Sequence, residues 1–382
     1  MIYLDNSATT KPSEAVLQTF LQVNEKYYAN PASIHEAGVV ANDLLTRARE
    51  QIAALVKTDA KQVLFTSGGT ESNNFALYSV AKSNTHIGKH ILINETEHPS
   101  VLEAAKRLVE EGFELEYLRV DEHGAISLEQ LERKLRKDTI LVSVMHVNNE
   151  MGAISPIASI AKIVHDQSRA IFHVDAVQSF GKMPISFNGG FGADILTASG
   201  HKIHGLNGSG FIAFRKQMNS TPLIVGGGQE FGLRSGTVAV PLAVSLAKAA
   251  RLAVEAIPTH ATNFMKWNAD LRAFLQQFEQ EVYILSPEDA APHILSFSVK
   301  GLKGEVLINA LQKREIIVST SSACSSKQTK NSHVVEAMNI PDVFKKGVIR
   351  ISFGGMTTEA DIEGFKKGFQ LVMNELKGVV NQ

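Results

Sequence analysis

A glycine-rich segment joins a short apolar run to a helical pattern, and its sequence is Phe65-Thr-Ser-Gly-Gly-Thr-Glu-Ser-Asn-Asn74. Backbone N–H groups at the start of a helix attract anions, and glycines let an anion come close to the backbone. The segment is not a Walker loop, because no Gly-Lys-Ser/Thr follows its glycines. Taken alone, such a segment is more often a simple strand-to-helix turn, so it indicates an anion site only together with other features.

Two residues that could do chemistry each follow a different apolar run. Asp175 comes directly after residues 171–174, and Lys202 comes soon after residues 195–197. Open α/β sheets bind ligands at the C-terminal edge of their strands, where both residues would then lie. Taken singly, such an aspartate is more often a helix cap or turn residue, and a lysine is more often a solvated charge.

Two histidines beside Lys202 raise the alternative of a metal site. His201 and His204 are separated by two residues, but the sequence offers no third ligand nearby and the single cysteine lies far along the chain. A structural or catalytic zinc needs three or four protein ligands. We therefore expect no metal.

The order of these groups favours pyridoxal-5'-phosphate (PLP) instead. PLP needs a phosphate site, a carboxylate that keeps its pyridine nitrogen protonated, and a lysine that binds it covalently. The glycine-rich segment, Asp175 and Lys202 supply these groups in that order along the chain. The combination predicts a PLP enzyme, although each feature alone does not.

The only cysteine, Cys324, lies in the polar, serine-rich stretch of residues 319–328. A single cysteine is often a small buried hydrophobe, but so polar a stretch is a poor candidate for a packed core. Thiolate is the reactive form of cysteine, and cations at Lys327, Lys330 or His333 would favour it. We expect a loop that lets the sulfur enter a site and leave it again.

The elements that must position these residues alternate between short apolar runs and helical patterns from about residue 61 to residue 215. The runs are continuously apolar, which is typical of strands buried on both faces. Alternating strands and helices indicate an α/β fold with a parallel sheet. Strands are predicted at 63–66, 90–93, 140–144, 171–174, 195–197 and 210–214, with helices at 36–56, 102–109 and 128–135.

The C-terminal part has a different character. Two long helical patterns between residues 238 and 278 are broken near Pro258, and mixed elements follow. Strands are predicted at 294–299, 316–319 and 348–352, and helices at 304–313 and 365–376. We predict a large domain of residues 13–251 and a smaller α+β domain of residues 1–12 and 252–382 that carries Cys324.

Composition restricts the class of protein. The chain has 382 residues, of which 44% are hydrophobic and 20% charged, a balance typical of globular proteins. With 38 basic and 39 acidic residues, the net charge of −1 gives no reason to expect nucleic acid or a membrane as a direct partner. No apolar run approaches the ~20 residues that span a bilayer. The N-terminus shows no secretory signal and one cysteine fits a reducing compartment, so we expect a cytoplasmic protein.

The chain resembles the NifS-like cysteine desulfurases, in the class V aminotransferase group of fold-type-I PLP enzymes. The resemblance implies a large domain with a mainly parallel sheet and a smaller α+β domain. It runs through nearly the whole sequence, in Tyr3-Leu-Asp-Asn-Ser-Ala-Thr-Thr10, Asn30-Pro-Ala-Ser33, Thr66-Ser-Gly-Gly-Thr-Glu-Ser-Asn-Asn74, Glu97-His-Pro-Ser100, Asn148-Asn-Glu-Met-Gly152, Val174-Asp-Ala-Val-Gln178, Ser199-Gly-His-Lys202, Arg234-Ser-Gly-Thr237, Ser321-Ser-Ala-Cys324 and Ile349-Arg-Ile-Ser352.

The resemblance also implies a role for individual residues. Lys202 would bind PLP covalently, and Asp175 would hold the pyridine nitrogen. Gln178 would contact the ring hydroxyl, and His98 would stack on the ring and take part in catalysis. The phosphate would be held by Gly69, Thr70, Ser199 and His201, with Thr237 from the second subunit of a homodimer. The substrate carboxylate would be bound by Asn149 and Arg350, since a guanidinium matches a carboxylate with two hydrogen bonds.

The implied reaction converts L-cysteine to L-alanine. Lys202 would remove the Cα proton, and Cys324 would attack the substrate sulfur and become a persulfide. Selenocysteine lyase or another class V activity such as transamination is the alternative, although Cys324 argues against transamination. A non-catalytic binding scaffold would not need the set formed by Lys202, Asp175, His98 and Cys324.

The sequence departs from housekeeping relatives, which usually carry His and Arg where Gln229 and Phe231 stand. This change affects the rim of the site or the subunit contact. The chain also ends at Gln382 without the longer tail of some relatives, and relatives that serve iron–sulfur scaffolds often dock them near such a tail. We therefore favour a tRNA 4-thiouridine sulfurtransferase over an iron–sulfur scaffold as the sulfur acceptor, with the acceptor rather than this chain binding the RNA.

Overall fold

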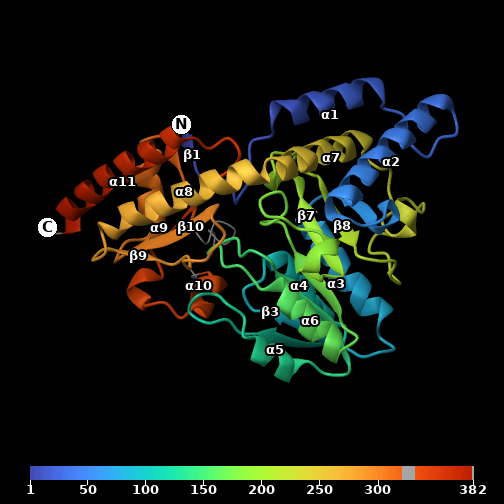
Figure 1. Ribbon diagram of the computed structural model, residues 1–382, viewed down its shortest axis with the longest axis horizontal. Helices are drawn as coiled ribbons and strands as arrows, with labels where there is room; N and C mark the ends of the chain where they lie inside the picture. Colours follow the sequence, from blue (N-terminus) through green and yellow to red (C-terminus); the bar gives the residue numbers. More distant parts are fainter. Residues whose placement is uncertain (321–331, 381–382) are drawn as a thin grey trace.

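A seven-stranded sheet forms the centre of the larger part of the molecule (Figure 1). The computed structural model describes residues 1–320 and 332–380. Along the sheet the strands are β2 (Val63–Thr66), β8 (Gly210–Phe214), β7 (Ile195–Ser199), β6 (Ile171–Asp175), β5 (Thr139–Met145), β3 (His90–Asn94) and β4 (Glu114–Leu118). All neighbouring pairs are parallel except those of β8, which runs antiparallel to both β2 and β7. The predicted α/β fold with a mainly parallel sheet is confirmed.

Helices cover both faces of this sheet, and successive strand residues therefore enter different cores. Leu64 packs with α3 (Gly69–Ser83) and α4 (Pro99–Glu110), whereas its neighbour Phe65 belongs to the core on the other face. That second core also holds side chains of α1 (Glu14–Lys26), α2 (Glu36–Val56), α5 (Leu128–Lys134), α6 (Ile157–Gln167) and α7 (Val240–Glu255). Burial on both faces explains why most of these strands are continuously apolar in sequence.

The smaller part of the molecule has a separate core, which lies around a three-stranded antiparallel sheet. The strand order in this sheet is β12 (Val348–Ser352), β10 (Ile294–Val299) and β9 (Val282–Ile284). The N-terminus joins it, because Leu4 lies in this core and β1 (Ile2–Tyr3) pairs with β11 (Ile316–Ile317). The helices here are α8 (Ile257–Gln276), α9 (Gly304–Gln312), α10 (His333–Ala337) and α11 (Glu359–Val380). In the described residues, no helix is long and apolar enough to cross a membrane.

The link between the two parts runs through α7 and α8, which follow each other across the upper half of Figure 1. The break that the sequence predicts near Pro258 lies at Ala256, where α7 ends and α8 begins. The boundary placed between residues 251 and 252 falls inside the last turns of α7. The domain limits themselves stay a prediction.

A buried ion pair fastens the loop before α7 to the edge of the large sheet. The Arg49 guanidinium donates to both carboxylate oxygens of Glu230, at 2.6 Å each, and to the Val63 carbonyl at 2.6 Å. The same carboxylate accepts the Phe65 backbone N–H at 2.9 Å, so an edge-strand donor is satisfied by a side chain. The Arg49 guanidinium also lies 5.0 Å from the ring centres of both Phe65 and Phe231.

We expect Glu230→Ala to destabilise the chain by about 3–5 kcal/mol, because it leaves the Arg49 charge buried without its partner. The exposed pair of Arg251 and Glu255 provides a matched control, since Glu255→Ala should cost less than about 1 kcal/mol. Denaturant unfolding of both variants measures the difference. Equal losses for the two variants would contradict this reading of the buried pair.

Candidate active site

The C-terminal edge of the large sheet brings the predicted site residues together. Asp175 is the last residue of β6, and Lys202 ends a short turn of 3-10 helix (Gly200–Lys202) directly after β7. Because β8 is antiparallel to both its neighbours, β2 runs in the same direction as β7. The glycine-rich start of α3, which follows β2, therefore lies at the same edge.

The Asp175 carboxylate is buried and held by two hydrogen bonds. Its Oδ2 accepts from Asn73 Nδ2 at 2.7 Å, and its Oδ1 accepts from the Val177 backbone N–H at 2.9 Å. Hydrogen bonds to a carboxylate favour its charged form. The two hydrogen bonds therefore fix the orientation of the carboxylate at this edge of the sheet.

Lys202 lies against the N-terminal segment of the chain. Its Nζ donates to the carbonyls of Ser7 and Ala8, the second at 2.7 Å. Gln178 donates from Nε2 to the same Ser7 carbonyl at 2.9 Å. The first residues of the chain thus form one wall of the site, which their motif alone did not indicate.

Lys182 is a site residue that the sequence analysis missed. Its Nζ donates to Gln178 Oε1 at 3.2 Å, so the amide oxygen of Gln178 faces Lys182. Burial, and then the charges of Lys202 and Arg350, lower the pKa of Lys182 to about 7. In the sequence it is one lysine in a turn, and no local pattern shows that it is buried.

His98 is the N-cap of α4 and has a defined tautomer. Its Nδ1 accepts the Ser100 backbone N–H at 3.1 Å, so a neutral ring carries its proton on Nε2. Burial lowers the pKa of His98, against the opposing effect of Asp175 and together with the charge of Lys202. The ring is therefore set to be neutral.

The start of α3 forms a cradle that side chains would fill. A Cβ on Gly69 would lie 2.8 Å from Val177 Cγ2, and Gly68 has a φ of 149°, which favours glycine. The Ser199 hydroxyl is buried beside this turn and has no hydrogen-bond partner in the described residues. Thr70 lies in the first turn of α3. An open backbone, a helix start and an orphaned hydroxyl fit a phosphate.

The other two groups expected at the phosphate are His201 and Thr237, and His204 is the second histidine of the metal alternative. Burial, and then the charges of Lys202 and Lys182, lower the pKa of His201 to about 4, and its Nδ1 lies 3.2 Å from Thr9 Oγ1. His204 uses both ring nitrogens, donating to the Lys11 carbonyl and accepting the Gly355 N–H, so it offers no free metal ligand. Thr237 is exposed.

Arg350 reaches the site from β12 of the smaller sheet. Its side chain is 4% exposed and donates to the Asn149 carbonyl at 2.8 Å and to Asp5 Oδ1 at 2.9 Å. Its Nε has no partner in the described part of the chain. Burial raises the pKa of the neighbouring Glu150 to about 7, although the Ser332 hydroxyl and the Arg350 charge act in the opposite direction.

The cations expected near the cysteine are only partly described. Cys324, Lys327 and Lys330 lie outside the described residues. His333 donates from Nε2 to the Glu97 carbonyl at 2.9 Å, and burial lowers its pKa. His333 is therefore set to be neutral, whereas the sequence analysis proposed it as a cation.

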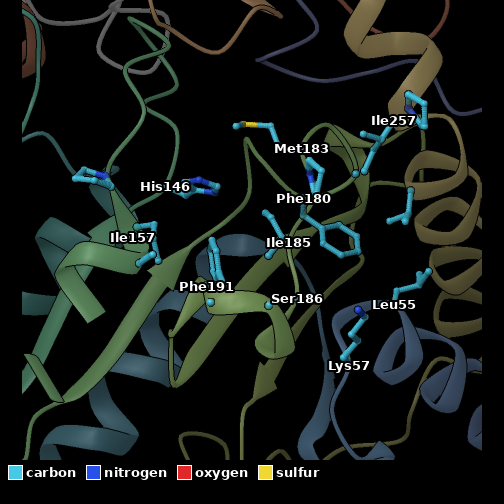
Figure 2. Close-up of a pocket in the computed structure, with 18 of the residues that line it drawn as sticks. Leu55, Lys57, His146, Ile157, Phe180, Met183, Ile185, Ser186, Phe191 and Ile257 are labelled. Carbon is cyan, nitrogen blue, oxygen red and sulfur yellow. The ribbon is translucent and has the colours of Figure 1, made fainter. Parts of the chain in front are cut away.

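One cavity of the described residues lies away from these groups. It has a volume of about 710 Å³, and Figure 2 shows its apolar lining, with Phe180, Ile185 and Phe191 near its middle and His146 to one side. None of the predicted site residues lines it. A smaller cavity of about 230 Å³ is bordered by both Lys182 and Lys202.

Known proteins resemble the chain over nearly its whole length. The family described as aminotransferase class-V matches residues 2–365. A NifS/IcsS protein homolog of Lactobacillus delbrueckii subsp. bulgaricus is 39% identical, covering 97% of this chain and 96% of the relative. Cysteine desulfurase IscS 1 of Archaeoglobus fulgidus is 35% identical, covering 99% and 98%. A solved NifS-like protein superposes with a TM-score of 0.92 at 36% identity, covering 98% of this chain and 99% of that one.

We expect Lys182→Met to stabilise the cofactor-free chain at neutral pH by on the order of 3 kcal/mol, because a buried ammonium opposes folding. The unfolded chain keeps the Lys182 proton up to about pH 10.4, whereas the folded chain loses it near pH 7. The cost of the buried charge is therefore complete below pH 7 and disappears as the pH rises to about 10.

Denaturant unfolding of the cofactor-free protein at about pH 6.5 to 10 measures this effect. This range covers the roughly three-unit gap between the pKa values of Lys182 in the folded and the unfolded chain. The gain from Lys182→Met should shrink steadily with rising pH. The exposed Lys26 provides the control, since Lys26→Met should change stability little at any pH. A gain from Lys182→Met that is constant with pH would show that Lys182 is not a buried titrating group.

Proposed function

The chain belongs to the aminotransferase class-V family and is a PLP-dependent cysteine desulfurase, and from this premise we propose that it transfers the sulfur of L-cysteine to Cys324 and then to an acceptor protein. One observation carries the proposed site. Asp175, Lys202 and the glycine-rich start of α3 lie at one edge of one sheet, although they are far apart in sequence.

The groups at this edge fit PLP. The orphaned Ser199 hydroxyl and the open backbone at Gly69 suit a phosphate, and the buried Asp175 carboxylate suits a protonated ring nitrogen. PLP, when bound, supplies an electron sink for the negative charge left at Cα after proton removal. The residues that would hold it are Gly69, Thr70, His98, Asp175, Gln178, Ser199, His201 and Lys202, with Thr237 from a second subunit.

We assign proton transfer to Lys202. Its amine would bind the cofactor, and as a free amine it would accept the Cα proton of L-cysteine. The carbonyls of Ser7 and Ala8 accept from Nζ, which keeps the amine at the site. His98 would cover the ring with a neutral imidazole, since burial lowers its pKa.

Arg350 and Asn149 would bind the substrate carboxylate. The guanidinium is anchored on one side by Asp5 and on another by the Asn149 carbonyl, which leaves Nε as the donor without a partner in the described residues. A buried guanidinium donor without a partner is costly, and a substrate carboxylate would remove that cost.

Cys324 would receive the sulfur. Its thiolate attacks the sulfur of the bound substrate, the C–S bond breaks, and the carbon product takes up protons to leave as L-alanine while the cysteine becomes a persulfide. The residues that flank the Cys324 segment, Ser319 and Ser332, are held near Arg350 by hydrogen bonds. Ser319 and Arg350 exchange backbone hydrogen bonds at 3.2 and 2.7 Å, and Ser332 donates to Glu150 at 2.6 Å. Five residues from Ser319 reach at most roughly 17 Å, which supports access of Cys324 to the substrate.

The proposed function predicts that substitutions of Cys324 and of Lys202 abolish different parts of the reaction. Cys324→Ser protein should keep bound PLP and still change its absorption spectrum with L-cysteine, yet lose nearly all sulfide release, because it lacks the acceptor sulfur. Lys202→Ala protein should lose both responses, because it lacks the amine that binds PLP and moves the proton. Absorption spectra and a sulfide assay with reductant measure both. Undiminished sulfide release by Cys324→Ser would rule out the persulfide route.

We further propose a homodimer in which Thr237 completes the partner's phosphate site. Thr237 is exposed in the single chain, and large apolar side chains are exposed on the connection between α1 and α2 and on the loop before α7. They include Tyr28, Ile34, Val225 and Phe231, which are 83%, 98%, 78% and 55% exposed. Exposed apolar surface of this kind is typical of contact surfaces, and two-fold dimers are the commonest oligomers.

Mixed dimers test this arrangement. One subunit carries Lys202→Ala and the other Thr237→Asp, and each variant alone should be nearly inactive. If Thr237 serves the partner's site, the mixed dimer contains one complete site and should regain up to about half of the wild-type activity, because one of two sites is intact. Tandem affinity purification isolates the mixed species. No recovery, or a fully active monomer by sedimentation, would contradict the proposal.

For the acceptor we propose a cytoplasmic tRNA 4-thiouridine sulfurtransferase. The net charge of −1 supports an acceptor that brings its own RNA-binding surface, because RNA binding depends on basic residues. L-[35S]cysteine, the chain, and either such an enzyme or an iron–sulfur scaffold are incubated together. Label should move to the thiouridine enzyme at least about tenfold faster, a difference of ~1.4 kcal/mol in the barrier. Faster transfer to the scaffold would reverse this assignment.

A further inference from the structure

Asn73 is a buried residue of α3 that connects Asp175 with His98, the two groups expected on either side of the cofactor. Its side chain is 1% exposed. Its Nδ2 donates one hydrogen bond to Asp175 Oδ2 at 2.7 Å and another to Ser100 Oγ at 2.9 Å. Its Oδ1 accepts from Thr197 Oγ1 at 2.6 Å. Both amide hydrogens and the amide oxygen are thus used.

The orientation of this amide follows from its neighbours. Asp175 is a carboxylate that only accepts, so the nitrogen of Asn73 must face it. Thr197 then donates to Asn73 and can accept from His173 Nε2, which lies 3.3 Å away. Ser143 lies 2.8 Å from His173 Nδ1 and donates to it. Burial lowers the pKa of His173 to about 3, which agrees with a neutral ring carrying one proton.

The second hydrogen of Asn73 acts through Ser100 on His98. Ser100 Oγ accepts from Asn73, so its own hydrogen is available for His98 Nδ1 at 2.8 Å. The Ser100 backbone N–H points to the same Nδ1, which makes that nitrogen an acceptor. Every bond of the chain from Ser143 to His98 therefore has a defined direction.

We propose that Asn73 is a positioning residue that holds the Asp175 carboxylate and the His98 imidazole in one hydrogen-bonded unit. The inference rests on the proposed function, because that function places these two groups around PLP. Among the contacts described for the Asp175 carboxylate, the other comes from Val177, two residues along the chain. Asn73 is thus the contact that ties Asp175 to another element of the fold.

The charge and the hydrogen bonds around position 73 explain why an amide side chain suits it. An aspartate at position 73 would place a second carboxylate against Asp175, and like charges at this distance repel. A leucine would fill similar space but would remove one hydrogen bond each from Thr197, Asp175 and Ser100. The helix itself does not require a bonded polar group on its buried face, since Ser79 of α3 is buried and its hydroxyl has no partner in the described residues.

The test compares Asn73→Leu, Asn73→Asp, Ser100→Ala and the control Ser79→Ala with the wild-type chain, all reconstituted with PLP. Circular dichroism establishes that each is folded. Equilibrium dialysis gives the dissociation constant of PLP, and an absorption titration from acid to alkaline pH gives the protonation of the bound chromophore. A hydrogen bond to a charged group corresponds to a roughly 10- to 100-fold change in an equilibrium constant.

We expect both Asn73 variants to bind PLP roughly 10- to 100-fold more weakly and to shift the chromophore titration, because Asp175 is no longer held. Ser100→Ala cuts only the branch to His98, so it should lower kcat while weakening PLP binding less than either Asn73 variant does. Ser79→Ala should match the wild type. This pattern separates positioning from a general loss of packing.

Three results would overturn the inference or its premise. Wild-type-like PLP affinity and titration in folded Asn73→Leu or Asn73→Asp would show that Asn73 does not position Asp175. Failure of both Asn73 variants to fold would make the residue a structural one, and the proposal would fall equally. A wild-type chain that does not bind PLP would remove the proposed function, and that result is distinguishable because it precedes any substitution.

Discussion

The negative charge of Asp175, at the end of a strand buried on both faces, is the constraint on which the rest of the site depends. A buried carboxylate is costly unless hydrogen bonds or opposite charges compensate it, and here Asn73 and the Val177 N–H donate to it. The nearby Glu97 is also buried, and burial together with the charge of Asp175 raises its pKa well above the usual range. The shift favours the neutral form of Glu97, so the two buried carboxyl groups differ in their settings.

Three basic side chains of the site, those of Lys182, Lys202 and Arg350, lie close enough to influence one another. Lys182 and Arg350 are buried, and neighbouring cations contribute to the low pKa of Lys182. Such a cluster opposes folding when nothing is bound, and it would be compensated by a phosphate and a substrate carboxylate. The N-terminal segment holds the cluster together, because Ser7 and Ala8 accept from Lys202 and Asp5 accepts from Arg350.

Much of the fold could be predicted because its strands are continuously apolar, and the predicted ranges 63–66 and 294–299 coincide with β2 and β10. The edge strand β4 was missed, because Glu114 and Glu116 interrupt its apolar pattern. The direction of β8 was not predicted, since periodicity identifies a strand but not its orientation. Asn73 and Lys182 were missed as site residues for a related reason. Asn73 finds its partner Asp175 at a distance of 102 residues along the chain, and Lys182 is buried by the tertiary fold around it. Local sequence does not encode either feature.

The central claim is that Lys202, rather than another amine of this crowded site, binds PLP. Lys182 is the natural competitor, since its low pKa leaves part of its amine uncharged near neutral pH and it borders the same cavity as Lys202. Reduction of the PLP-loaded wild-type chain with borohydride, followed by peptide mapping, distinguishes the two. We expect the cofactor to be fixed to the peptide that contains Lys202. Label on Lys182 or on any other lysine would contradict it.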